Sequence, residues 1–244
     1  MKIPTIGVIG MGKMGQAIAG LLETRQDLKY RTFQRVSAEN KDALMSCDVV
    51  IEFTIPEAAP GVIRQCLEFG VPVVSGTTGW HEYQLESILS FCKQHKSTFL
   101  YATNFSIGMN ITFALNRKLA EVMSGLPQFH PSLKEIHHIH KKDSPSGTAY
   151  TLIEDILNYH PQYYGFELNG DTKNPSPGKL PVNAVREGEV KGFHQVSWNS
   201  GLEQITIAHE AFDRRIFAEG AVMAALWLYA QPTGIYTMKD IIRM

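Results

Sequence analysis

A glycine-rich turn near the amino terminus restricts the folds open to this chain more than any other feature. The motif GMGKMG at 10–15 follows the short apolar run TIGVIG at 5–10 and precedes a helical pattern over 13–25. In such a turn the first glycine permits a tight bend, the second lets a pyrophosphate approach the backbone, and the third lets helix and strand pack closely. The turn therefore predicts a strand, a dinucleotide-binding loop and a helix at the start of a parallel sheet.

The same strand-then-helix pattern continues as far as residue 104. Short β-rich runs lie at 29–34, 49–54, 71–79 and 98–104, and the continuous apolar run at 49–54 is typical of a strand covered on both faces. Helical patterns lie between them at 56–68 and 81–95, where Pro56 occupies a natural position for the start of a helix. This alternation predicts an α/β fold of Rossmann type with a doubly wound parallel sheet.

The pattern changes after residue 106. We expect a helix at 108–123, a strand at 132–140, a helix at 148–160, a long mobile loop at 170–181, and alternating strands at 190–198 and 203–212. Such strands favour an open, mixed sheet in an α+β unit. The apolar helical run at 214–230 is expected to pack back on the first domain. The predicted organisation is a dinucleotide-binding domain at 1–106 and 214–244, and a second domain at 107–213.

Composition and charge argue against several classes of partner. The formal net charge is −1 and 44% of the residues are apolar, which is ordinary for a soluble protein and gives no general attraction to nucleic acid or to an anionic membrane. No run reaches the ~20 apolar residues of a membrane span, and the amino terminus does not resemble a signal peptide. Cys47, Cys66 and Cys92 are widely spaced and suggest reduced thiols. We therefore expect a cytoplasmic protein.

The segment after the second predicted strand indicates which dinucleotide binds. An acid there would bind the ribose hydroxyls of the adenosine, but none occurs before Glu39. Arg35 is instead placed to pair with a 2′-phosphate, although a solvated surface arginine is an alternative interpretation of this residue. The sequence favours NADPH, with NADH as the alternative cofactor.

Two further segments follow predicted strands at the carboxyl edge of the sheet, where open α/β sheets bind ligands. Small residues at 76–79 and 102–106 would let the nicotinamide ribose lie against the backbone, although each segment taken alone reads as a simple turn. With the glycine turn and Arg35, these segments give the candidate cofactor-binding residues Gly10, Met11, Gly12, Lys13, Met14, Arg35, Gly76, Thr77, Thr78, Ala102, Thr103, Asn104 and Phe105.

Cationic and titratable side chains are concentrated in the run EIHHIHKKDSPSGTA at 135–149. If 133–140 is a strand, Glu135 and His137 lie on one face and His138 on the other. Lys141 continues the His137 face if the strand runs one residue further. Ser146 or Thr148 can cap the helix that follows, whose first backbone N–H groups attract a carboxylate. This combination of cations and a helix start predicts a site for a small polycarboxylate.

Two other interpretations of the cluster remain open. His138 and His140 could bind a metal with Glu135 or Asp143, but zinc needs ligands that converge on one point, and here the faces diverge beside two lysines. We therefore predict no metal site. The cluster could also be a solvated basic strand without chemistry, which the downstream Pro-Ser-Gly-Thr at 145–148 and the upstream glycine turn argue against.

The run at 135–149 resembles the signature of the 4-hydroxy-tetrahydrodipicolinate reductase (dihydrodipicolinate reductase) family. The resemblance extends to the segments at 10–15, 76–79, 104–108 and 217–228. It implies an enzyme of the diaminopimelate route to lysine that uses NAD(P)H to convert 4-hydroxy-tetrahydrodipicolinate, with loss of water, to tetrahydrodipicolinate. A dehydrogenase acting on another amino or hydroxy diacid would keep the glycine turn without needing the His-Lys run. A non-catalytic NADPH-binding regulatory protein would bind the cofactor but show no turnover.

The same resemblance implies roles for individual residues. His137 and Lys141 would carry the acid–base chemistry, with Lys141 donating the proton that accompanies hydride transfer. His138 and the amides of Gly147 and Thr148, together with Ser146, would hold a substrate carboxylate. The domain at 107–213 would bind the substrate, and its open sheet would build a homotetramer. Among the departures from the family pattern, the glycine turn is one residue tighter than in many members, which puts its exact phosphate contacts in doubt, and Gln34 replaces a frequent acid, which supports NADPH.

Overall fold

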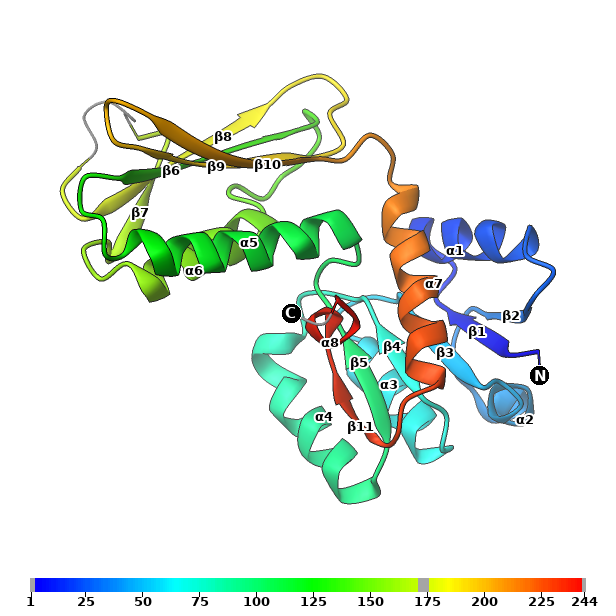
Figure 1. The fold of residues 1–244 in the computed structure, drawn as a ribbon. Coiled ribbons are helices and arrows are strands. Elements are labelled where there is room, and N and C mark those ends of the chain that lie inside the picture. The colour runs from blue at the N-terminus through cyan, green and yellow to red at the C-terminus, as the bar shows by residue number, and fades with distance from the viewer. Residues whose placement is uncertain (1–2, 171–175, 243–244) are drawn as a thin grey trace. The chain divides into compact units, whose positions relative to one another are not determined.

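A computed structural model of the chain describes residues 3–170 and 176–242 and divides into two compact units (Figure 1). The first unit comprises the residues up to Ile107 together with those from Arg215 onward, and the second comprises Gly108–Arg214. In the described part of the chain, no helix is both long and apolar enough to cross a membrane.

The first unit contains a six-stranded, all-parallel sheet in the order β11-β5-β4-β3-β1-β2. Its strands are β1 (Thr5–Ile9), β2 (Lys29–Phe33), β3 (Val49–Glu52), β4 (Val73–Ser75), β5 (Thr98–Tyr101) and β11 (Gly234–Tyr236). Its helices are α1 (Lys13–Glu23), η1 (Ala38–Asn40), α2 (Lys41–Met45), α3 (Ala59–Glu68), α4 (His81–His95), α7 (Arg215–Tyr229) and α8 (Met238–Ile242).

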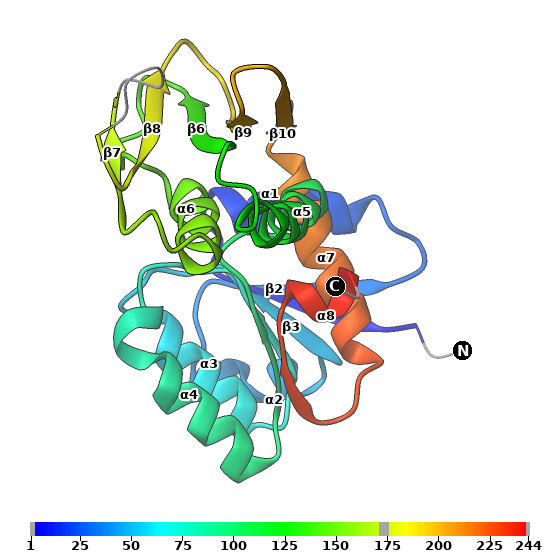
Figure 2. The ribbon, with the colours of Figure 1, turned by 60° about the vertical axis from the view of Figure 1, so that its left-hand side comes forward.

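Helices cover both faces of this sheet, as the α/β alternation predicts (Figure 2). On one face, Val8 and Ile51 pack with residues of α1 and α7, whereas on the other face Val50 and Val73 pack with residues of α2, α3 and α4. Successive strand residues point to opposite faces, so a continuous apolar run such as β3 supplies both cores. The predicted doubly wound parallel sheet is confirmed.

Helix α7 completes the first unit from the far end of the sequence. Its small residues allow close packing: a Cβ placed on Gly220 would lie 1.8 Å from the carbonyl oxygen of Phe105. Ala218, Ala221 and Ala225 are buried in the same core as β1 and β3. The first unit is therefore built from two separate stretches of chain.

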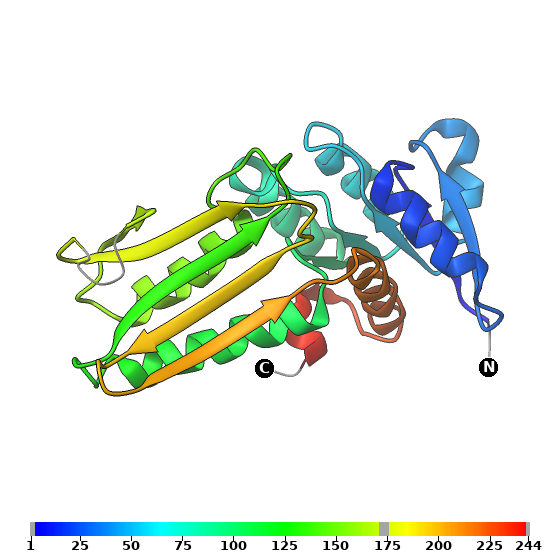
Figure 3. The ribbon, with the colours of Figure 1, turned by 90° about the horizontal axis from the view of Figure 1, so that it is seen from above.

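The second unit contains a five-stranded mixed sheet in the order β10-β9-β6-β8-β7. Its elements are α5 (Ile107–Met123), β6 (His130–His137), α6 (Gly147–Tyr159), β7 (Gly165–Leu168), β8 (Lys179–Arg186), β9 (Phe193–Asn199) and β10 (Gln204–Glu210). β8 pairs in parallel with β6 and β7, while β9 pairs antiparallel with β6 and β10. Both helices lie on one face of the sheet (Figure 3), where Phe113, Ile153 and Val182 share a core. The predicted open mixed sheet is confirmed.

Several predicted boundaries were wrong. The strand expected to end at residue 140 ends at His137, and the helix expected from Pro56 begins at Ala59. The loop expected at 170–181 overlaps β8, and its residues 171–175 lie outside the described part of the chain. Gly178 and Pro181 made this segment read as a loop, yet Leu180 and Val182 alternate into the core and pair the strand with both neighbours. β7, β8, η1, α2, β11 and α8 were not predicted.

Candidate active site

The glycine turn between β1 and α1 has the shape that a dinucleotide requires. Gly10 has φ +89°, and a Cβ there would lie 2.2 Å from the carbonyl oxygen of Phe53. A Cβ on Gly15 would lie 1.8 Å from the carbonyl oxygen of Gly10, so only glycine permits this contact of helix and strand. At Gly12, by contrast, a Cβ would meet nothing within 4 Å. Gly12 is also the N-cap of α1 and makes no side-chain cap, which leaves the helix start suited to a phosphate.

The other predicted cofactor residues lie in the first unit, either at the start of α1 or just after the carboxyl ends of strands. Arg35 is exposed just after β2, and Lys13 is exposed on α1, while Met11 and Met14 are half-buried against the core. Thr78 and Thr103 are exposed after β4 and β5. Gly76, Ala102 and Asn104 are half-buried, whereas the side chains of Thr77 and Phe105 are buried.

A buried carboxylate fixes the loop after β4. Glu52, at the end of β3, accepts hydrogen bonds from the hydroxyls of Ser75 at 2.7 Å and Thr77 at 2.6 Å, and from the backbone N–H of Thr54 at 2.7 Å. The side chain of Glu52 is fully buried, so these donors replace its hydration. Glu52 therefore ties the ends of two neighbouring strands together beside the glycine turn.

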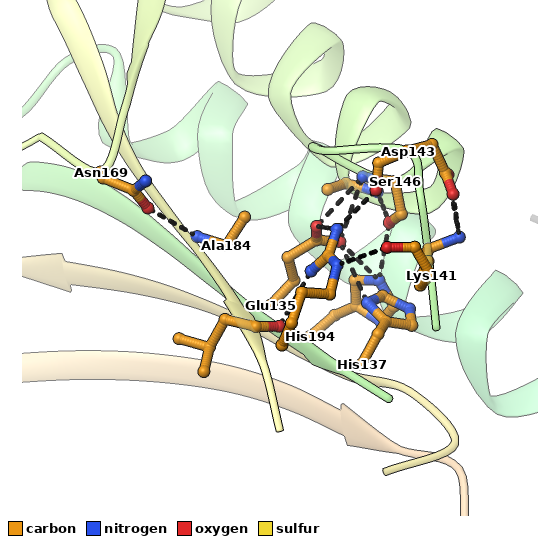
Figure 4. Close-up of polar contacts among 11 residues, drawn as sticks. Glu135, His137, Lys141, Asp143, Ser146, Asn169, Ala184 and His194 are labelled. Carbon is orange, nitrogen blue, oxygen red and sulfur yellow. Dashed lines mark hydrogen bonds and ion pairs between the residues drawn. The ribbon is translucent and has the colours of Figure 1, made fainter. Parts of the chain in front are cut away.

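In the second unit, the predicted catalytic and substrate-binding residues lie between the end of β6 and the start of α6. Figure 4 shows three of them, His137, Lys141 and Ser146. Glu135 and His137 share one face of β6, as strand alternation predicts, with 3.5 Å between the Glu135 Oε2 and His137 Nδ1 atoms. Both side chains are buried. The condition for Lys141 to share this face is not met: β6 ends at His137, and Lys141 lies in the turn that follows.

The turn after β6 gives Lys141 and His138 polar partners. The Lys141 ammonium donates to Asp143 at 2.8 Å, and its side chain remains 22% exposed. The Nε2 atom of His138 lies 2.9 Å from a guanidinium nitrogen of Arg214, which makes this nitrogen the acceptor. Partial desolvation and the positive charge of Arg214 lower the pKa of His138. His140 is exposed.

Helix α6 begins where the sequence predicted a binding site for a carboxylate. Ser146 is its N-cap, and its hydroxyl accepts a hydrogen bond from the Ala149 N–H at 3.1 Å. Gly147 is exposed as the first helical residue, and Thr148 follows it half-exposed. No acidic side chain lies in the first turn of α6, and just before it the buried Glu135 carboxylate accepts a hydrogen bond from the Ser146 N–H at 3.1 Å.

Glu135 and His137 have shifted pKa values because they are buried together. Burial alone would raise the pKa of Glu135, but His194, Ser146, His137 and Arg186 around the carboxylate lower it to about 2. Burial lowers the pKa of His137 to about 4, assisted by His194, Lys141 and Arg186 and opposed by Glu135. At neutral pH the site therefore holds an ionised Glu135 and a neutral His137.

Sequence reasoning missed His194 and Arg186. His194 lies on β9 with its Nε2 atom 3.2 Å from the Ser146 hydroxyl and 3.6 Å from Glu135 Oε2. Arg186 lies at the end of β8, a strand that was not predicted. Alternation along the predicted strand at 190–198 could have placed His194 on the buried face, but no local signal identifies Arg186.

Glu135, His137 and His194 also have the spacing of metal ligands, since one ligand atom of each lies within 4.8 Å of the others. Of the possible metal ligands that the sequence suggested, which were Glu135, His138, His140 and Asp143, only Glu135 belongs to this group. The Arg186 guanidinium lies 3.2 Å from the same carboxylate and Lys141 is nearby. Because both cations would repel a metal ion, we assign no metal to this group.

Comparison with known protein families and with similar sequences agrees with the resemblance noted in the sequence. Residues 4–105 match the model of the amino-terminal domain of dihydrodipicolinate reductase, and residues 108–242 match that of its carboxy-terminal domain. The chain belongs to the dihydrodipicolinate reductase family. The 4-hydroxy-tetrahydrodipicolinate reductase of Christiangramia forsetii is 41% identical over 97% of both chains, and that of Alkaliphilus metalliredigens is 35% identical over 95% of both chains. The resemblance seen in the sequence is confirmed.

Solved structures of similar fold come from reductases and dehydrogenases. A dipicolinate-bound dihydrodipicolinate reductase from Paenisporosarcina sp. TG-14 superposes with a TM-score of 0.77 at 22% identity, covering 98% of this chain and 100% of its own. An engineered D-amino acid dehydrogenase bound to NADP+ gives a TM-score of 0.54 at 13% identity, covering 97% and 93%. The chain is an oxidoreductase of this reductase family, and a nicotinamide dinucleotide is its cofactor class.

Proposed function

We propose that the protein reduces 4-hydroxy-tetrahydrodipicolinate to tetrahydrodipicolinate in diaminopimelate and lysine biosynthesis, with NADPH preferred and NADH as the alternative. The reaction consumes one reduced dinucleotide and one proton and releases one water. The observation that carries the proposal is the juxtaposition of Lys141, His137 and the exposed start of α6 in a chain of this family. A dicarboxylate substrate suits this cationic site, and the dipicolinate bound by the similar reductase is such a ligand.

The start of α6 and His138 would bind the substrate. The amides of Gly147 and Thr148 would receive one carboxylate, because a helix N-terminus combines N–H donors with a favourable dipole. The Ser146 hydroxyl is engaged as the N-cap, so its contribution would be to hold these amides in place. His138, next to the Arg214 guanidinium, would bind the carboxylate by hydrogen bonding.

Proton transfer falls to Lys141. The reduced nicotinamide supplies the hydride, and a proton must then reach the neighbouring ring carbon. Lys141 lies in the turn between His137 and the start of α6, and Asp143 holds its ammonium at 2.8 Å. His137 is neutral and buried beside it, where it would orient the reacting ring or exchange a proton with Lys141.

A coupled assay tests the proposal directly. Pyruvate and aspartate semialdehyde are supplied with the synthase that condenses them, and loss of the near-ultraviolet absorbance of NADPH is followed. We expect oxidation of NADPH that depends on this protein, on the synthase and on both substrates. An absence of oxidation by folded, NADPH-binding protein would contradict the proposed reaction.

The preference for NADPH should depend on Arg35. We expect Arg35→Ala to raise the KM for NADPH by roughly tenfold and to leave the KM for NADH unchanged, because only NADPH carries the 2′-phosphate that the guanidinium would pair with. Arg31→Ala, an exposed arginine on β2, is the matched control and should change neither value. Equal KM values of the native protein for the two cofactors would reject this role of Arg35.

Assembly and location are proposed from the family resemblance. The open face of the five-stranded sheet, opposite α5 and α6, carries polar residues of β6 and β9 such as Lys134 and Gln195 around a shallow groove. We propose that this face forms the interface of a cytoplasmic homotetramer. The formal net charge of −1 supports the view that neither nucleic acid nor a membrane is a partner.

A further inference from the structure

Three elements of the candidate active site meet at one buried ion pair. The guanidinium of Arg186, at the end of β8, lies 3.2 Å from Oε1 of Glu135 on β6. The Glu135 side chain is fully buried and that of Arg186 is 20% exposed. Neither residue is among the predicted catalytic or substrate-binding residues.

Arg186 reaches the turn that carries Lys141. Its guanidinium donates to the carbonyl oxygen of Asp143 at 2.5 Å and to that of Lys141 at 3.3 Å, in addition to the Glu135 carboxylate. These carbonyls stand on either side of Lys142, so they fix the backbone of the turn without contacting the Lys141 ammonium. The planar guanidinium of arginine has donors that point in several fixed directions, so it can bind these two carbonyls and the carboxylate at once. The single ammonium of a lysine could not do so in this geometry.

Glu135 reaches the other two elements. Its Oε1 atom accepts a hydrogen bond at 3.1 Å from the backbone N–H of Ser146, the N-cap of α6. Its Oε2 atom faces the imidazoles of His137 at 3.5 Å and His194 at 3.6 Å (Figure 4). One carboxylate therefore contacts the start of the helix on one side and the histidine rings on the other.

We propose that the Glu135–Arg186 ion pair is the positioning unit of the active site, which sets the His137 ring, the Lys141 turn and the start of α6 relative to one another. This inference rests on the proposed function for the meaning of those three elements. Neither residue is assigned contact with substrate. Both act through the groups that they hold.

The charge of Glu135 also selects the tautomer of His137. The groups that face this carboxylate are His137 on β6, Arg186 on β8, His194 on β9 and the Ser146 N–H before α6. An ionised carboxylate only accepts hydrogen bonds, so a neutral His137 is most stable with its proton on Nδ1, facing Glu135. Its Nε2 atom, on the side of Gly192, is then the nitrogen that can accept a proton.

Glu135→Gln tests this tautomer assignment directly, because the glutamine amide has an acceptor oxygen at one end and a donor NH₂ at the other. Arg186 and the Ser146 N–H can only donate, so the amide oxygen should stay beside them and the amide NH₂ should face the histidines, whose nitrogens can accept. We expect His137 to change from the Nδ1–H to the Nε2–H tautomer. Nitrogen-isotope labelling of the histidines and long-range proton–nitrogen correlation spectra would show the change, with His137→Asn identifying the signal.

Kinetics of the same variant give a second measurement. We expect Glu135→Gln to lower kcat by roughly 10²-fold, the loss typical of a displacement of about 1 Å at a reacting group. The dissociation constant for NADPH should stay unchanged, because the glycine turn belongs to the other unit. Glu135→Asp keeps the charge and should recover part of kcat. Glu154→Gln, an exposed glutamate on α6, is the matched control and should behave as the native protein.

The partner substitutions test the pair as a unit. Arg186→Lys keeps the charge but not the fork, so we expect kcat to fall while the His137 tautomer stays Nδ1–H. Breaking a buried pair leaves one charge uncompensated, so Glu135→Gln with Arg186→Met should be less destabilised than the sum of the two single variants. The tautomer spectrum needs no turnover, so it remains informative even if the proposed reaction is wrong. An unchanged tautomer in folded Glu135→Gln, or a native kcat, would overturn the inference.

Discussion

Lys141→Ala is expected to lower kcat by roughly 10²–10⁴-fold, the range found when a positioned general acid is removed. The ammonium lies in the turn between His137 and the start of α6, and Asp143 holds it at 2.8 Å. Alanine removes the proton donor while the backbone of the turn remains bound to Arg186 through the carbonyl of residue 141. The loss should therefore appear mainly in kcat, measured with saturating NADPH in the coupled assay.

The next residue in the chain supplies the control. Lys142 is exposed in the same turn and has the same charge, so Lys142→Ala removes an equal charge without removing the proposed donor. We expect a kcat within about twofold of the native value, since surface charges interact weakly. Equal losses in Lys141→Ala and Lys142→Ala would indicate a general charge effect in place of proton donation. A native kcat for Lys141→Ala would reject the donor role.

The first unit was predictable because its signals are local. The glycine turn fixed the first strand and helix, and buried strands such as β3 are recognisable as continuous apolar runs. Helix α4 was predicted with its observed bounds at 81–95. The short strand β11 and helix α8 were missed, since three or five residues carry too little periodicity to distinguish them from a turn.

The active site was predictable only as far as single segments reach. The run at 135–149 contains the strand end, the turn and the helix start, so strand alternation placed Glu135 beside His137 correctly. Alternation failed for Lys141, because the strand stops at His137 and a turn positions the lysine. Arg186 could not be found from local sequence, because its position in the site depends on the pairing of β8 with β6. That pairing joins residues about fifty positions apart.

Gly12→Asp is expected to weaken NADPH binding by roughly 10²–10³-fold without unfolding the protein. Gly12 has φ −73°, which any residue can adopt, and a Cβ there meets no atom within 4 Å. An aspartate at this N-cap can accept a hydrogen bond from the first turn of α1, which should stabilise the helix by roughly a few tenths of a kcal/mol relative to glycine. The same carboxylate would occupy the place proposed for the pyrophosphate, where two charges about 4 Å apart repel by about 4 kcal/mol.

Gly20→Asp is the matched control for Gly12→Asp. Gly20 is exposed on the same helix, and a Cβ there also meets nothing within 4 Å, so the variant introduces an equal charge away from the helix start. Calorimetric titration with NADPH should show native affinity for Gly20→Asp and a large loss for Gly12→Asp, whose melting temperature should not fall. Unchanged affinity in Gly12→Asp would place the phosphates elsewhere. A comparable loss in both variants would mean that overall charge controls binding, because the two substitutions differ only in their distance from the start of α1.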